Sequence, residues 1–182
     1  MKLIYTLLVT AAACNCTSLP ENTPRRSARQ CAFPIEVRLS PMLPSKKAQA
    51  VVRGFTYWNH VTGKEIYRVR YIEPAGGGPR ADYLPVRTTR EPQRWCGLTR
   101  YNILMDSCVN RNEVIFSEAP GCWEDDRVLE SVARHEAGHA LGLNHSTSPW
   151  ALMFKAVNKN NRHPVPATED EKAAARSLTR EY

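Results

Sequence analysis

The sequence lacks a C-x-x-C pair, an internal repeat and a low-complexity tract. Without C-x-x-C, the usual cysteine spacing of a zinc finger is excluded. The short N-terminal apolar run cannot cross a membrane as a mature helix, and no longer apolar run follows it. The chain of 182 residues is therefore expected to form one domain with its own hydrophobic core.

The N-terminal stretch MKLIYTLLVTAAAC has one lysine, a short apolar run and small residues before Cys14. It predicts a secretory signal peptide over residues 1–13, cut after Ala13. It also resembles a bacterial lipoprotein signal, in which Cys14 would receive lipid, although Ala11 stands where that signal usually has Leu. Both alternatives predict export, to the cell exterior, the periplasm or a lipid anchor at the envelope. Residues 14–30 are expected to be an exposed tether before a folded domain at 31–182.

Four cysteines lie in the expected folded region: Cys31, Cys96, Cys108 and Cys122. Cysteines of exported proteins tend to pair, and four cysteines allow three pairings that the sequence does not separate. We expect structural disulfides here rather than a metal site with cysteine ligands.

The net charge of +7 is unevenly distributed. Residues 1–100 hold sixteen Lys and Arg against six Asp and Glu, whereas residues 101–182 hold nine against twelve. A basic front half can favour acidic substrates, an anionic membrane or nucleic acid. We interpret the excess instead as a solvated face, with arginines that alternate along exposed strand positions, as in YRVRYIE. No nucleic-acid motif is present, so we expect no nucleic-acid partner.

The sequence predicts an α+β fold from its hydrophobic periodicity. Strand patterns are expected at 33–40, 65–73, 81–87, 98–106 and 113–118, and a helix at 122–143 with acidic residues in its first turn. Another helix should run from Ser45, as N-cap, to Gly63. A third should start at Thr168, with Glu171 completing a capping box.

The stretch HEAGHALGLNHS, at residues 135–146, contains three of the five histidines of the chain. His135 and His139 are four residues apart, so on a helix both imidazoles point at one ion. Glu136 lies beside them, where it can act on a water bound to that ion. This is the H-E-x-x-H arrangement.

The next residues extend the site. Gly142 can adopt a left-handed conformation and turn the chain back, which would let His145 supply a third nitrogen. Three protein ligands and one open position are typical of a catalytic zinc site. We expect the remaining histidines, His60 and His163, to be surface residues.

HEAGHALGLNH followed by SPWALMF resembles the metzincin zinc proteases, and within them the matrixins most closely. The resemblance implies a zincin-like single domain with a twisted, mostly parallel sheet of about five strands. It also implies an active-site helix, a first-half helix and a C-terminal helix. It further implies one catalytic zinc held by His135, His139 and His145, with Glu136 as general base and Met153 in a supporting turn beneath the metal.

The chain departs from relatives of that family at several points. Lys155 stands where the astacin and serralysin branches carry a tyrosine, and no H-x-D motif predicts the second zinc of vertebrate matrixins. The family's propeptide cysteine is absent, so we do not expect a zymogen of the family type. Calcium stays open, because no EF-hand-like spacing is present. The resemblance further implies that substrate lies along an edge within 97–107, with a pocket wall at 154–157.

The sequence thus predicts an exported, monomeric zinc endopeptidase that acts on peptides or proteins and contacts membrane only through a lipid anchor. An alternative is a zinc-binding surface or interaction protein that keeps the scaffold but cleaves little; Glu136 argues against it. A third alternative, a binder of anionic surfaces or nucleic acid, rests on charge alone.

Overall fold

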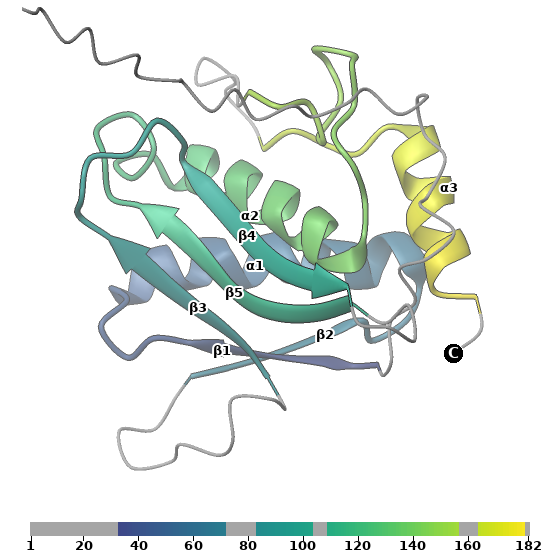
Figure 1. The fold of residues 1–182 in the computed structure, drawn as a ribbon, viewed down its shortest axis with the longest axis horizontal. Helices are drawn as coiled ribbons and strands as arrows, with labels where there is room; N and C mark the ends of the chain where they lie inside the picture. Colours follow the sequence, from purple (N-terminus) through teal and green to yellow (C-terminus); the bar gives the residue numbers. More distant parts are fainter. Residues whose placement is uncertain (1–32, 72–82, 104–108, 157–163, 181–182) are drawn as a thin grey trace, which may run out of the picture.

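The computed structural model describes residues 33–71, 83–103, 109–156 and 164–180, and the side chains of 101–103 and 109–112 are not described (Figure 1). The predicted signal peptide, the tether and Cys14 lie outside these residues. The elements, in chain order, are β1 (Ile35–Leu39), α1 (Ser45–Thr62), β2 (Tyr67–Tyr71), β3 (Leu84–Thr89), β4 (Gly97–Ile103), β5 (Val109–Ser117), α2 (Asp126–Leu141) and α3 (Glu169–Leu178).

The strands form one sheet in the order β2-β1-β3-β5-β4. All neighbours are parallel except β4, which runs antiparallel to β5 and forms one edge of the sheet. In β1, Ile35, Val37 and Leu39 are buried and the residues between them are not, as the period of two predicts. The predicted α+β fold with a mostly parallel sheet is confirmed.

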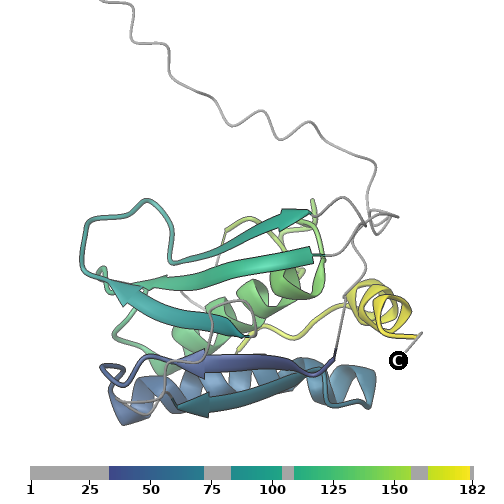
Figure 2. The same ribbon diagram turned by 60° about the horizontal axis from the view of Figure 1, so that its bottom comes forward.

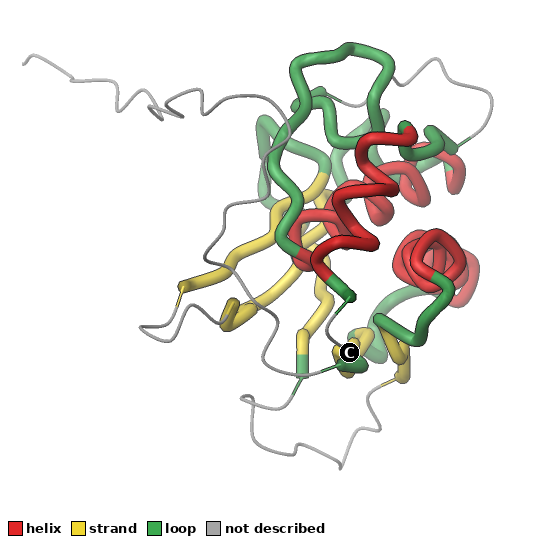
Figure 3. Tube along the Cα trace, turned by 90° about the vertical axis from the view of Figure 1, so that its right-hand side faces the viewer, coloured by secondary structure: helices red, strands yellow, loops and turns green. Residues whose placement is uncertain are grey.

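Helices α1 and α2 pack on one face of this sheet, with helices on one side and strands on the other (Figure 3). Gly54 of α1 lies against Ala133 of α2 so closely that a Cβ on Gly54 would clash. The Trp58 indole also donates a hydrogen bond of 2.8 Å to the Arg134 carbonyl. The predicted apolar stripe of α2 is buried throughout: Val128, Leu129, Val132, Ala133, Ala137, Ala140 and Leu141.

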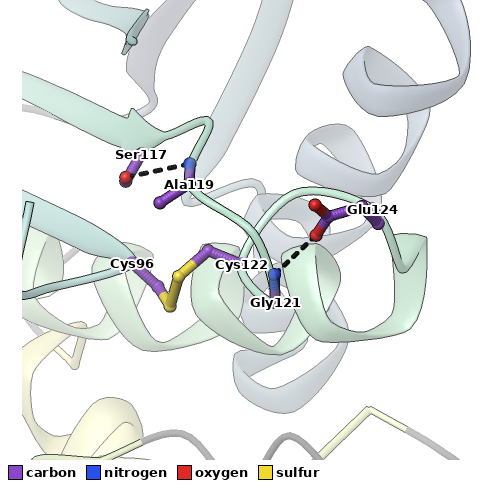
Figure 4. The surroundings of a disulfide bond; sticks show 6 residues. All are labelled: Cys96, Ser117, Ala119, Gly121, Cys122 and Glu124. Carbon is purple, nitrogen blue, oxygen red and sulfur yellow. Dashed lines mark hydrogen bonds between the residues drawn. A yellow bond between two sulfur atoms is a disulfide. The ribbon is translucent and has the colours of Figure 1, made fainter. Parts of the chain in front are cut away.

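Helix α1 begins at Ser45 as predicted, but the predicted cap of α1 and the predicted start of α2 are wrong. The Pro44 carbonyl already accepts from the Ala48 amide, 2.9 Å away, so α1 has Pro44 at its cap and Ser45 inside the helix. Helix α2 begins at Asp126 rather than at residue 122, because the Asp125 carboxylate accepts from the Arg127 amide and caps it there. Glu124 precedes the helix and accepts from the Gly121 amide instead (Figure 4).

The strand limits also differ from the sequence-based prediction. β5 begins at Val109 rather than at residue 113, because its first residues pair with β4, whose register shifts between Arg100 and Tyr101. β3 runs two residues further than predicted, to Thr89, where it pairs with the end of β5. Pairing with a neighbouring strand sets the start of β5 and the end of β3, and the local sequence pattern contains no information on that neighbour.

A disulfide joins Cys96, directly before β4, to Cys122 in the loop before α2 (Figure 4). Their Cα atoms are 5.2 Å apart. Structural disulfides were predicted, and the Cys96–Cys122 bond belongs to one of the three complete pairings that the sequence left open. Cys31 and Cys108 lie outside the described residues. The disulfide fixes the start of the edge strand relative to the start of α2.

The sheet face away from the helices carries paired charges. Arg70 is ion-paired with Glu36 at 2.7 Å, and Arg87 with Glu113 at 2.6 Å. Such pairs match the interpretation of the basic front half as a solvated face. Figure 2 shows the strands one above another, from β4 at the top to β1 and β2 at the bottom, with α1 behind β1 and β2. Within the described ranges, no helix has both the length and the apolar character to span a membrane.

Removing the disulfide by the double substitution Cys96→Ala and Cys122→Ala should lower the free energy of unfolding by about 3 kcal/mol. The expected cause is the larger conformational freedom of the unfolded chain, since 26 residues separate the two cysteines. Urea unfolding of wild type and variant measures this loss in the free energy of unfolding. With reductant present, the gap between wild type and variant should narrow; equal stability in oxidising buffer would contradict the prediction.

Candidate metal centre

Helix α2 presents His135, Glu136 and His139 in its last turns. Gly142 follows with a left-handed φ of 108°, and the Leu143 amide donates to the Gly138 carbonyl at 2.9 Å. This conformation is unfavourable for a residue with a Cβ, so glycine suits the end of the helix. The chain turns there, as the sequence predicted, and His145 comes back toward the helix.

The three histidines converge. One nitrogen from each of His135, His139 and His145 lies within 4.8 Å of the other two. The Nε2 atoms of His139 and His145 are 3.1 Å apart. Ligand atoms of a tetrahedral zinc with Zn–N bonds of about 2.05 Å are separated by about 3.3 Å. The spacing of this pair is therefore close to what one zinc ion requires.

The other ring nitrogens are occupied by backbone carbonyls. The Leu152 carbonyl lies 2.8 Å from Nδ1 of His135, and the Leu143 carbonyl lies 2.8 Å from Nδ1 of His139. A carbonyl only accepts, so each Nδ1 carries the proton and each Nε2 keeps a lone pair toward the centre of the cluster. The Nε2 of His145 lies 3.1 Å from the lone pair on Nε2 of His139, an approach that either a proton on His145 or a cation bound by both nitrogens accounts for, so the donor set fits a metal ion.

Burial keeps these imidazoles neutral. It lowers the pKa of His135 to about 4 and, together with the charge of His135, that of His139 to about 3. The pKa of His145 is also lowered, by burial and then by the charge of Lys155. Neutral imidazole is the form that binds zinc, so the site does not need to lose protons at neutral pH.

Glu136 is buried, with 4% of its surface exposed. Burial raises the pKa of its carboxyl to about 7, while a hydrogen bond from Thr99 opposes the rise. The Thr99 hydroxyl donates to Oε2 at 2.7 Å. A carboxyl with a pKa near 7 can accept and release a proton at neutral pH, as a general base needs.

Met153 lies in the turn that follows the third histidine. It is buried, and its Sδ is so close to Gly138 that an added Cβ would lie 2.5 Å from it. The Ser146 amide donates to the Met153 carbonyl at 2.8 Å. The turn is thus packed against α2 and bonded to the residue after His145; its supporting role beneath a metal stays a prediction.

A buried carboxylate from α3 holds this turn. Glu171 accepts from the Met153 amide at 2.6 Å, the Leu152 amide at 3.3 Å and the Thr168 amide at 2.7 Å. The Thr168 capping box is present as predicted. No local pattern in the sequence indicates that Glu171 also binds the turn. Through the Met153 amide, Glu171 holds the same peptide unit whose Leu152 carbonyl orients His135.

Other predicted residues lie apart from the cluster. His60 is exposed on α1, as predicted, whereas His163 and Val157 lie outside the described residues. Phe154 forms an isolated bridge with Ser146, and Lys155 is exposed beside it. The sequence-based search missed Thr99, because it is 37 residues from Glu136 and no local pattern marks it.

Glu171→Ala should destabilise the protein by about 3 kcal/mol or more, because two buried amides and one partly buried amide lose their acceptor. Zinc affinity should fall by about 10- to 100-fold, since the Leu152 carbonyl would no longer hold His135 firmly. Urea unfolding and chelator competition measure the two effects. Glu169→Ala, an exposed glutamate in the same helical turn, is the control and should change stability by less than about 0.5 kcal/mol. Equal effects of the two variants would contradict the assigned contacts.

Metal-free protein should lose stability as the pH falls from about 6.5 to about 4.5. Unfolded histidines take up protons near pH 6.5, but folded His135 and His139 stay neutral to about 4 and about 3. Glu136 has the opposite effect on stability, because its folded pKa of about 7 exceeds its ordinary value of 4.5 and it takes up a proton in the folded state first. The loss from two histidines is larger than the gain from this one carboxyl. Urea unfolding with chelator at several pH values measures how steeply the free energy of unfolding changes with pH. This pH dependence should flatten in the double variant His135→Gln and His139→Gln; an equally steep slope there would refute the assignment.

The sequence comparisons agree with this geometry. Residues 87–179, just over half of the chain, match the family model described as matrixin. The chain is 50% identical over 42 residues to metalloendoproteinase 5-MMP of Arabidopsis thaliana, which covers 23% of this chain and 12% of the relative. It is 42% identical over 50 residues to human matrix metalloproteinase-20, covering 28% of this chain and 10% of the relative. The matched stretches thus span about a tenth of each relative. The match includes the end of β3, all of β4, β5 and α2, and α3. The chain therefore belongs to the matrixin family.

Proposed function

We propose that this protein is an exported, zinc-dependent endopeptidase that hydrolyses peptide bonds in peptide or protein substrates. Membership of the matrixin family gives the general class of zinc metalloprotease. The observation that carries the proposal is the convergence of three neutral histidines next to a buried carboxyl with a pKa of about 7. The names of the two matched relatives, both metalloproteinases, support the same class.

One zinc ion would be held by His135, His139 and His145, which leaves one position for substrate or water. Zinc, when bound, would polarise the scissile carbonyl and lower the pKa of water near it. The carbonyls of Leu152 and Leu143 hold two of the imidazoles in the tautomer that this requires. Calcium has no support among these contacts and is not part of the proposal.

Glu136 would move the proton. Its carboxylate takes a proton from the attacking water, and then passes that proton to the amine that leaves as the peptide bond breaks. The pKa of about 7 suits both steps, because neither the charged nor the neutral form is strongly favoured at neutral pH. The buried position also limits access of bulk water to the carboxyl.

The substrate would lie along β4. This strand is at the sheet edge, and in the described part of the chain its only strand neighbour is β5. An extended peptide can add to such an edge through backbone hydrogen bonds. Thr99 and Glu136 show that β4 passes directly beside α2, so a peptide on this edge would pass close to the histidines. Phe154 and the residues after it would form a side-chain pocket.

We also propose export through the signal-like residues 1–13, with Cys14 either lipidated or left free, and function as a monomer. Globomycin-sensitive processing and labelling with palmitate in a bacterial host would separate lipidation from cleavage after Ala13. This part of the proposal rests on the N-terminal sequence alone.

Glu136→Ala should lower kcat/KM at least about a hundredfold, because general base catalysis typically contributes that much. Zinc content should stay near one per chain, since Glu136 is not one of the three converging ligands. Cleavage of denatured casein and mass spectrometry of bound zinc measure both. Chelator should abolish activity and added zinc restore it.

The same measurements separate the alternatives. One zinc per chain without cleavage by wild type, across diverse unfolded substrates, would favour a zinc-binding surface protein and contradict the protease proposal. Binding to nucleic acid that weakens steeply with salt and ignores chelator would favour an anionic-surface binder.

A further inference from the structure

Thr99 of β4 makes two contacts with one residue of α2. Its hydroxyl is 2.7 Å from Oε2 of Glu136 and 3.0 Å from the backbone carbonyl of Glu136. A hydroxyl has one hydrogen to donate, and the carboxylate is both the nearer acceptor and the charged one. The stronger bond is therefore to the side chain, with the helix carbonyl as a second acceptor within reach.

The strand approaches Glu136 closely only because of its first residue. A Cβ on Gly97 would lie 2.6 Å from Oε1 of Glu136 and 2.6 Å from Cγ1 of Val132. Any other residue would push β4 away from α2 or displace the carboxylate. Glycine at 97 thus provides the close approach that brings the Thr99 hydroxyl within hydrogen-bonding distance.

The disulfide anchors the same segment. Cys96 precedes Gly97 and is bonded to Cys122, four residues before α2 begins (Figure 4). Residues 96–99, which we call the base clamp, are therefore held at one end by a disulfide to the loop before α2 and at the other by a hydrogen bond to α2 itself. Glu136 has several rotatable side-chain bonds, and a fixed donor on a rigid strand restricts the positions of its carboxylate.

We propose that Thr99 is a positioning residue that holds the Glu136 carboxylate in its working orientation, with Gly97 and the Cys96–Cys122 disulfide setting the distance. The proposal rests on the proposed function, in which Glu136 moves the proton. The contact also survives that transfer. When Oε2 carries the proton it can donate to the Thr99 hydroxyl oxygen, while the Thr99 hydrogen turns to the Glu136 carbonyl.

Thr99→Val keeps the shape of the side chain and removes the hydroxyl. We expect kcat to fall about ten- to a hundredfold, the range of a hydrogen bond to a charged group. KM and zinc affinity, by chelator competition, should change less than about twofold, because the hydroxyl is hydrogen-bonded to Glu136 and not to any of the three converging histidines. Thr99→Ser restores the hydroxyl and should recover most of kcat.

Thr88→Val is the matched control. The Thr88 hydroxyl also donates to a carboxylate, Oε1 of Glu118 at 2.6 Å, and both residues are apart from the histidines. This variant should lose comparable stability in urea and keep the wild-type kcat. Wild-type kcat in Thr99→Val, no recovery in Thr99→Ser, or an equal loss of kcat in Thr88→Val would each overturn the proposal.

A spectroscopic measurement decides the case without activity. In metal-free protein with ¹³C-labelled glutamate side chains, the Glu136 carboxyl resonance is assigned by its loss in Glu136→Gln. At fixed pH it should shift in Thr99→Val, return in Thr99→Ser and stay unchanged in Thr88→Val. If wild type cleaves nothing, the proposed function fails, and this resonance still tests the contact. An unmoved resonance in Thr99→Val would overturn the positioning role.

Discussion

Burial of α2 is the constraint on which the rest of the site depends. Twelve of its sixteen residues are buried, so the helix is covered on nearly all sides rather than along one stripe. Desolvation in that environment disfavours charge, which lowers the pKa of His135 and raises that of Glu136. The same packing that stabilises the helix therefore prepares neutral ligands and a proton-accepting carboxyl side by side.

Three buried glutamates differ in the groups that donate hydrogen bonds to their carboxylates, and this difference separates the two structural glutamates from the proposed general base. Glu130 is ion-paired with Arg53 at 2.7 Å and Arg134 at 2.6 Å, and Glu171 accepts from three backbone amides. Among the described contacts, the Glu136 carboxylate accepts only from Thr99, through the hydroxyl and the backbone amide of that residue, and both donors are neutral. In the described contacts no cationic side chain offsets the cost of burying the Glu136 charge, so burial outweighs the Thr99 hydrogen bonds and raises the pKa of this carboxyl. The least supported carboxylate is the one next to the histidines.

The site is assembled from segments far apart in the chain. α2 provides two histidines and Glu136, the turn at 148–154 provides Met153 and the Leu152 carbonyl, and α3 holds that turn through Glu171. β4 adds Thr99 from the opposite direction, fixed by the disulfide. His135 is thus oriented by backbone that another element keeps in place, which is what a preorganised metal site requires.

The sequence by itself determined the local features: the helical spacing of His135 and His139, the glycine that ends α2, the capping box at Thr168 and the apolar stripe of α2. These depend on residues within a few positions of one another, so periodicity and cap chemistry reveal them. Only the tertiary structure decided which cysteine joins Cys96, that Glu171 holds the turn, and that Thr99 bonds to Glu136. Those contacts join residues up to 37 positions apart, and their distances depend on how β4, α2 and α3 pack.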